Sequence, residues 1–231
     1  MKLVHYGHSA FQILTAGKSI LIDPFFSGNE LSKGIMDAET IEADYILLSH
    51  AHADHSYDVE RIAKRTGAKV VGVYELAEHY KALGIESHGM NIGGKFEFDF
   101  GVVKMVNAVH SSSFSDGKYG GVAGGFVVWN DEVCFYFAAD TALTLDMQLI
   151  PMTCPPLDFA ILPVGDNYTM GYEDAIIASD FLQCDRIVGS HYDTFPVIKM
   201  DHTKAVEAFK NENKQLILLA PGKSIEINHE S

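Results

Sequence analysis

Cysteine is scarce in this chain of 231 residues, which contains only Cys134, Cys154 and Cys184. The number is odd, no two are spaced as CxxC, and Cys134 and Cys184 lie among apolar neighbours, as buried thiols do. This composition excludes a fold that depends on a disulfide framework. It indicates a reducing compartment, and we expect the cytoplasm.

Cationic residues are also few, because 17 Lys and Arg stand against 31 Asp and Glu, for a formal net charge of −14. Such a surface repels phosphate backbones and anionic membranes. The chain has no run of 18 uncharged apolar residues, and no apolar run of signal-peptide length follows the initial MKLVHYGHSAF. We therefore expect a small-molecule substrate and neither nucleic acid nor a membrane as partner.

Short apolar runs rich in β-branched and aromatic residues recur along the chain, which is typical of strands. They predict strands over residues 2–6, 10–15, 19–22, 45–49, 69–73, 96–100, 102–109, 122–129, 133–138, 159–164, 186–190, 216–220 and 224–227. Apolar residues three and four apart predict helices over 59–65, 75–83, 143–150, 173–182 and 202–211. This order favours sheets in the middle and helices outside. One domain with an internal duplication and two domains both fit it.

The densest group of potential metal ligands follows the predicted strand 45–49. His50, His52, Asp54 and His55 stand within six positions there. Imidazole and carboxylate groups in one short turn suit Zn, Mn, Fe or Ni, whereas without a metal they would repel or desolvate one another. This turn therefore predicts a metal site at the edge of a sheet.

Three more predicted strands lead into residues of the same kind, namely His110, Asp140 and His191. One histidine after an apolar strand is more often an ordinary surface or core residue than a ligand. Three such residues beside the His50–His55 cluster carry more weight, because a metal site must recruit ligands from separate strands.

Taken in order, the HxHxDH motif at positions 50–55 followed by His110, Asp140 and His191 resembles the metallo-β-lactamase fold superfamily. The resemblance covers the whole chain and implies a four-layer αββα sandwich of the α/β class. It implies a single domain, 1–231, built from two pseudo-symmetric halves. It also implies two divalent metal ions, with zinc our first expectation and manganese, nickel or iron as alternatives.

The resemblance assigns each ligand by position. His50, His52 and His110 would hold one ion, Asp54, His55 and His191 would hold the other, and Asp140 would bridge both. Edge loops of this fold often meet in oligomers, so a homo-oligomer is compatible with the resemblance.

Further segments, YGHSAF at 6–11, LIDPF at 21–25, PVGDNYTMG at 163–171 and SHYDTFP at 190–196, are similar to small intracellular metal-dependent hydrolases that resemble the ascorbate-6-phosphate lactonases. A metal-bridging hydroxide would attack a small-molecule ester, lactone or related bond. Asp54 would be both a ligand and a proton shuttle. Phosphodiester hydrolysis remains an alternative, as does a non-catalytic metal-binding protein or a di-iron redox protein.

Several other residues are candidates for supporting roles. Asp23 ends a predicted strand, where its carboxylate could orient a ligand histidine, although an ordinary Asp-Pro turn explains it equally well. His8 is expected at the rim of the site, and His5 is at least as consistent with a structural role. The remaining candidates for substrate contact are Asn167, Tyr168, Thr169, Tyr192 and Thr194. We expect ordinary surface residues at His79, His88, His202 and His229.

Overall fold

The computed structural model describes residues 1–227 and contains two mixed sheets of seven strands each. In spatial order, the first sheet consists of β14 (Ser224–Glu226), β1 (Lys2–His5), β2 (Phe11–Thr15), β3 (Lys18–Ile22), β4 (Tyr45–Leu47), β5 (Lys69–Val73) and β6 (Ser87–Met90). The second consists of β13 (Gln215–Ile217), β12 (Arg186–Ser190), β11 (Phe159–Pro163), β10 (Cys134–Phe137), β9 (Gly124–Trp129), β8 (Gly101–Asn107) and β7 (Lys95–Phe98).

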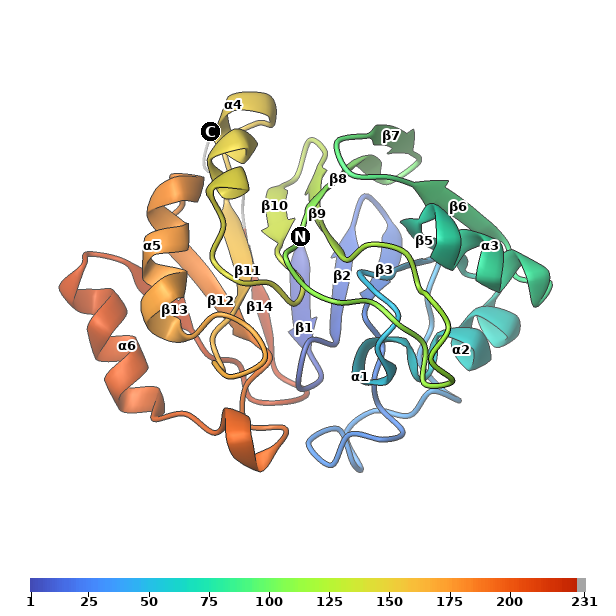
Figure 1. Cartoon of the computed structure of the whole chain (residues 1–231), viewed down its shortest axis with the longest axis horizontal. Helices are drawn as coiled ribbons and strands as arrows, with labels where there is room; N and C mark the ends of the chain where they lie inside the picture. The colour runs from blue at the N-terminus through green and yellow to red at the C-terminus, as the bar shows by residue number, and fades with distance from the viewer. Residues whose placement is uncertain (228–231) are drawn as a thin grey trace.

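Six α-helices and two short 3₁₀ helices accompany the sheets in the described part of the chain. They are α1 (Ala53–Ser56), α2 (Val59–Thr66), α3 (Tyr74–Ala82), η1 (Leu145–Leu149), α4 (Ile150–Thr153), α5 (Tyr172–Leu182), η2 (Pro196–Ile198) and α6 (His202–Asn211). Figure 1 shows α5 and α6 on one flank of the molecule and α2 and α3 on the other, with the strands between them. The predicted αββα layering is confirmed.

The two sheets repeat the same order of pairings. In the first, the pairs from β14 to β3 are antiparallel and those from β3 to β6 are parallel. In the second, the pairs from β7 to β10 are antiparallel and those from β10 to β13 are parallel. Each half of the chain thus builds a sheet with three antiparallel and then three parallel pairings.

Two apolar clusters hold these layers together. The larger one joins residues of both sheets, such as Ile13 and Phe135, to residues of α2 and α3, such as Ile62 and Leu76. The smaller one joins the second sheet to its helices through residues such as Tyr136 and Phe209. Because the central strands are buried on both faces, they form nearly continuous apolar runs, which is why their positions could be predicted from the sequence.

Local sequence explains where the flanking helices begin and end. In α2, Val59, Ile62 and Ala63 form the buried face, and the helix stops at Gly67, which adopts the left-handed conformation (φ 76°) that glycine tolerates. In α6, the Asp201 side chain caps the first turn by accepting a hydrogen bond from the Lys204 backbone amide.

The structure corrects several sequence-based predictions. Strand β6 and helix α1 were not predicted, because the Ser87–Met90 segment is short and polar and α1 is a single turn. The helix predicted over 143–150 is a 3₁₀ helix capped by Thr144 and followed by α4, with a proline in its first turn. Residues 111–125 are dense in serine and glycine, a composition that favours an exposed loop, but they are largely exposed only to residue 119. Among residues 1–227, no helix combines the length and hydropathy needed to span a bilayer.

Candidate metal centre

The candidate ligands lie just beyond the carboxyl ends of four strands. His50, His110 and Asp140 each stand three positions after β4, β8 and β10, and His191 directly follows β12. Strands β8, β10 and β12 run in the same direction within the second sheet, so their carboxyl ends meet at one edge. The turn after β4 in the first sheet faces this edge of the second sheet, so residues from both halves of the chain meet at one site.

Three imidazoles form the first ligand group. The Nε2 atom of His50 lies 3.1 Å from Nδ1 of His52. The ring centroid of His110 lies 5.1 Å from the centroids of both. All three ligand atoms fall within 4.8 Å of one another, a spacing that one cation could bridge. His50 is fully buried, whereas His52 and His110 are partly open to solvent.

A second group contains Asp54, His55 and His191. The Oδ2 atom of Asp54 lies 3.8 Å from Nε2 of His55 and 3.9 Å from Nε2 of His191. His8 joins this group, because its Nε2 is hydrogen-bonded to Asp54 Oδ2 at 3.1 Å. Its Nδ1 is hydrogen-bonded to Thr194 Oγ1 at 2.9 Å. His8 is buried and linked to Asp54, although the sequence suggested only a place at the rim.

Asp140 lies between the two groups. Its Oδ2 atom is 3.0 Å from Nε2 of His191, 3.3 Å from Nε2 of His55 and 3.5 Å from Nε2 of His110. A single carboxylate oxygen therefore contacts imidazoles of both groups. All seven ligands predicted from the sequence converge in the structure.

Asp23 supports the cluster from behind. Its fully buried carboxylate is 2.8 Å from Nδ1 of His55 and accepts hydrogen bonds from the backbone amide and the hydroxyl of Ser49, at 2.9 and 2.6 Å. The same Ser49 hydroxyl lies 2.9 Å from Nδ1 of His50. One carboxylate thus orients His55 directly and His50 through Ser49, so that Nε2 of each ring faces the other candidate ligands.

We expect Asp23→Asn to weaken metal binding about 10- to 100-fold, because an amide that donates a hydrogen bond cannot hold both rings in this tautomer. The measurement is a competition titration of the metal against a coloured chelator. Asp99→Asn is the matched control, since Asp99 is about half exposed and pairs with Lys18, away from the ligand groups. Equal affinity in the two variants would show that Asp23 does not orient the ligands.

Some buried polar atoms of the cluster make no hydrogen bond, which indicates a site able to bind cations. Within the described residues, Oδ1 of Asp140 is buried and has no hydrogen-bond partner, and the buried Nε2 of His55 makes no hydrogen bond beyond its 3.3 Å ionic contact with Asp140. Leaving such groups unpaired costs stability, and a divalent cation would satisfy them. The donor set of imidazole nitrogens and carboxylate oxygens is one that Zn²⁺, Mn²⁺, Fe²⁺ and Ni²⁺ accept.

Protonation states follow from burial and from the neighbouring charges. Burial and nearby imidazoles hold the pKa of His50 well below its usual value, so this ring is neutral and ready to bind metal. Burial opposes charge on His55 and Asp140 as well, but their mutual attraction prevails. This attraction raises the pKa of His55 well above the usual value for histidine. It also holds the pKa of Asp140 well below the usual value for aspartate. A metal ion held by His55 would displace the proton from that ring.

Left-handed backbone conformations concentrate at the centre. His8, Asp23, Ala139 and His191 have φ values of 57°, 44°, 60° and 55°, although none is glycine. Each such residue costs of order 1–3 kcal/mol and persists only where the surrounding structure enforces it. The backbone amide of His191 donates to the His8 carbonyl at 3.0 Å, so two of these residues secure each other.

Both ends of the 111–125 segment pack against the turn that carries His50 and His52. The backbone amide of Ala51 donates to Oγ of Ser112, at 3.2 Å, and that of Gly124 donates to the carbonyl of Ser49, at 3.1 Å. At Gly120, a Cβ atom would lie 2.2 Å from Cβ of Ala51. Glycine is required at this position because Ala51 stands between the ligands His50 and His52.

A cavity of about 860 Å³ opens over the ligands. The first half of the chain lines it with Phe25 and Tyr57, and the second half with Tyr168, Phe195 and Val197. Its volume is in the range of small-molecule sites. These apolar lining residues, other than Tyr168, were not predicted, although Phe25 and Phe195 belong to the family-like segments LIDPF and SHYDTFP.

The remaining candidates for substrate contact fall in different places. Tyr192 is buried and donates its hydroxyl to the Leu219 carbonyl, so it packs in the core instead of lining the cavity. Asn167 and Thr169 do not line the cavity either, and the Thr169 hydroxyl donates to the Met170 carbonyl. Thr194 does not line the cavity, and its Oγ1 is hydrogen-bonded to Nδ1 of His8.

The other five histidines bear on predictions made above. His5 is buried, with Nδ1 2.7 Å from the Leu219 carbonyl and its ring stacked on Phe11, which is a structural role. His79 and His88 are half-buried and His202 is exposed, and none of the three belongs to a ligand group. His229 lies outside the described residues.

Comparison with known proteins identifies related sequences. Residues 18–192 match the sequence model of a family described as the beta-lactamase superfamily domain. A protein of Christiangramia forsetii, described as a UPF0173 metal-dependent hydrolase, is 53% identical over 227 residues, which cover 98% of this chain and 100% of that protein.

Solved structures also include a related metallo hydrolase. Igni18, described as a novel metallo hydrolase from the archaeon Ignicoccus hospitalis, superposes with a TM-score of 0.89 and 32% identity over 99% of both chains. An isothiocyanate hydrolase from Delia radicum gut bacteria superposes with a TM-score of 0.77 over 99% of both chains. Its identity is 20%, so that likeness concerns the fold alone.

Proposed function

This chain belongs to the metallo-β-lactamase superfamily and is a metal-dependent hydrolase, and from this premise we propose that it hydrolyses a small-molecule ester or lactone at a centre of two divalent metal ions. The observation that carries the proposal is the position of Asp140, whose Oδ2 atom lies within 3.5 Å of imidazole nitrogens from both ligand groups. One carboxylate that contacts two sets of ligands is what a paired centre requires.

The residues divide between the two ions by proximity. His50, His52 and His110 would hold one, Asp54, His55 and His191 the other, and Asp140 both. When bound, two divalent cations lower the pKa of water towards neutrality and polarise the carbonyl oxygen of the substrate. Zinc is our first expectation for both positions, since this donor set and the burial suit it.

Asp54 is the side chain best placed to move a proton. Its side chain is 27% exposed and lines the cavity, whereas the carboxylate of Asp140 is only 3% exposed. The hydrogen bond from His8 and the charge of His55 outweigh burial and hold the pKa of Asp54 below its usual value. The carboxylate is therefore ionised at neutral pH, and we propose that it takes a proton from water and delivers it to the leaving oxygen.

The test is a panel of reactions with the full chain loaded in turn with zinc, manganese, iron and nickel. We expect at least one form to hydrolyse 4-nitrophenyl esters and alkyl lactones on the order of 100-fold faster than the chelator-treated protein. Bis(4-nitrophenyl) phosphate is included as the competing substrate. Faster hydrolysis of the phosphodiester would overturn the ester assignment, and tight metal binding without any turnover would favour a non-catalytic metal protein.

A further inference from the structure

Among the described residues, the wall of the cavity over the ligand groups carries no cationic side chain, so the proposed metal ions at its base are the source of positive charge there. Within the part of the chain that the structure describes, no lysine or arginine lines it. Its ionisable lining residues are ligands of the centre, such as Asp54 and Asp140, and the tyrosines Tyr57 and Tyr168. An anionic group on the body of a substrate would have to leave water here without gaining a cationic partner, which is costly.

The lining that remains is apolar and comes from both halves of the chain. Phe25 and Phe195 each pack against His8, with ring centroids 5.9 and 5.5 Å from the His8 ring. Tyr57, Tyr168 and Val197 are 60%, 56% and 57% exposed, which is unusual for large side chains that face one cavity. Exposed apolar groups gathered around a cavity are typical of a ligand site.

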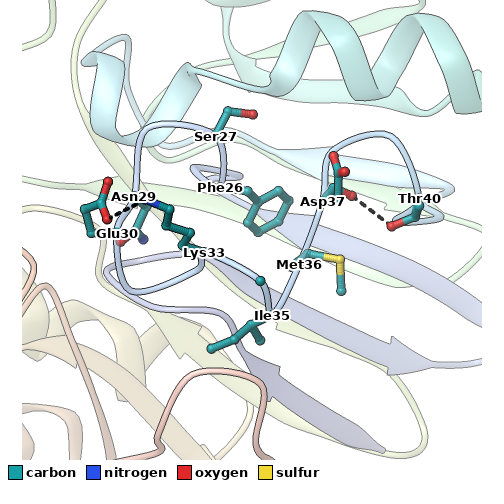
Figure 2. Close-up of a pocket in the computed structure, with 10 residues that line it drawn as sticks. Phe26, Ser27, Asn29, Glu30, Lys33, Ile35, Met36, Asp37 and Thr40 are labelled. Atoms are coloured by element: carbon teal, nitrogen blue, oxygen red, sulfur yellow. Dashed lines mark hydrogen bonds and ion pairs between the residues drawn. The ribbon is translucent and has the colours of Figure 1, made fainter.

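A neighbouring pocket shows where positive charge does occur. Loop residues 26, 27 and 29 line that pocket, while Phe25 and Gly28 of the same loop line the cavity over the ligands. Figure 2 shows Lys33 in this second pocket with its ammonium group directed to Glu30, 3.3 Å away. This lysine is therefore paired with a carboxylate and is not part of the lining beside the metal ligands.

We propose that the substrate is an uncharged molecule whose aromatic or aliphatic body lies against Phe25, Tyr57, Tyr168, Phe195 and Val197 while its scissile bond lies at the ligand groups. This inference rests on the proposed hydrolytic function and narrows its substrate class. A phosphorylated lactone, the substrate type of the ascorbate-6-phosphate lactonases that the branch resembles, does not fit the lining.

A matched pair of esters tests the proposal. 4-Nitrophenyl hexanoate and mono-4-nitrophenyl adipate have the same leaving group and differ at the end of the acyl chain, where the adipate carries a carboxylate. We expect kcat/KM of the zinc-loaded chain to be at least about tenfold higher for the hexanoate, because the carboxylate would be desolvated without a partner. From acetate to hexanoate, kcat/KM should rise by up to about fourfold for each buried methylene.

A charge placed at the rim should change this preference. Val197→Lys puts a cation beside the acyl chain at an exposed position, so the adipate-to-hexanoate ratio of kcat/KM should rise about tenfold. Val206→Lys is the matched control, because Val206 is exposed on α6 and does not line the cavity. It adds the same charge to the chain and should leave the ratio unchanged.

Binding of inhibitors provides a readout that does not need turnover. Hexanohydroxamate should bind the zinc-loaded chain at least about tenfold more tightly in calorimetry than the analogue with a terminal carboxylate. If both esters are hydrolysed equally well, or the adipate faster, the uncharged-substrate inference is wrong while the hydrolytic function stands. If neither ester reacts, the proposed function fails, and equal affinity for the two hydroxamates would then overturn the inference as well.

Discussion

Asp140→Asn should reduce the bound metal from the proposed two ions per chain to one or none and lower kcat/KM on the order of a thousandfold. The reason is the single oxygen that lies close to both ligand groups, 3.0 Å from Nε2 of His191 and 3.5 Å from Nε2 of His110. An amide is nearly the same size but carries no negative charge, so it cannot balance two cations. Metal content by elemental analysis and steady-state kinetics measure the two effects.

The control for this variant is again Asp99→Asn, the same chemical change at a half-exposed carboxylate that pairs with Lys18. Far-UV circular dichroism of the metal-free forms would show that both variants fold. A variant at Asp140 that retained two ions and full activity would exclude a shared role for this carboxylate. Loss of one ion with activity retained would show that a single metal suffices for turnover.

Asp54→Asn should act on turnover more than on metal content. The amide oxygen of asparagine can still bind a cation, but the side chain can no longer carry a proton, so we expect kcat to fall roughly 100- to 10,000-fold. The fall in kcat should exceed the fall in metal affinity, which a chelator competition measures. The Asp54 side chain lines the cavity and is hydrogen-bonded to His8, so it is open to substrate and held in place.

Leaving-group dependence separates the proton role of Asp54 from its role as a ligand. A 4-nitrophenolate leaves without a proton, whereas the alkoxide of an alkyl lactone needs one. The loss caused by Asp54→Asn should therefore be larger for lactones than for 4-nitrophenyl esters. An equal loss for both substrates, accompanied by an equal loss of bound metal, would leave Asp54 with a ligand role alone.

The convergence of the candidate metal ligands could be predicted from the sequence because their signal is local. His50, His52, Asp54 and His55 stand together, and the other three ligands follow apolar strands that are recognisable one at a time. Central strands such as β5 and β12 were predicted with their observed bounds, since β-branched runs buried on both faces have few other structures open to them.

The supporting residues could not be predicted in the same way, because their roles depend on contacts between distant parts of the chain. The sequence predicts only that Ser49 ends a strand, and the fold is needed to show that it links Asp23 to His50. Similarly, Tyr192 stands beside a ligand in the sequence, yet its hydroxyl is directed to Leu219 in the core. The wall of the cavity combines Phe25 with Phe195, which no local pattern could pair.

Each ligand group crosses the boundary between the two sheets. His110, which follows β8 of the second sheet, completes the set begun by His50 and His52 after β4 of the first, and His191 after β12 does the same for Asp54 and His55. Neither half of the chain carries a whole coordination sphere by itself. A small displacement of one sheet relative to the other would therefore disturb both ligand groups at once, so the geometry of the candidate centre depends on how accurately the two halves pack together.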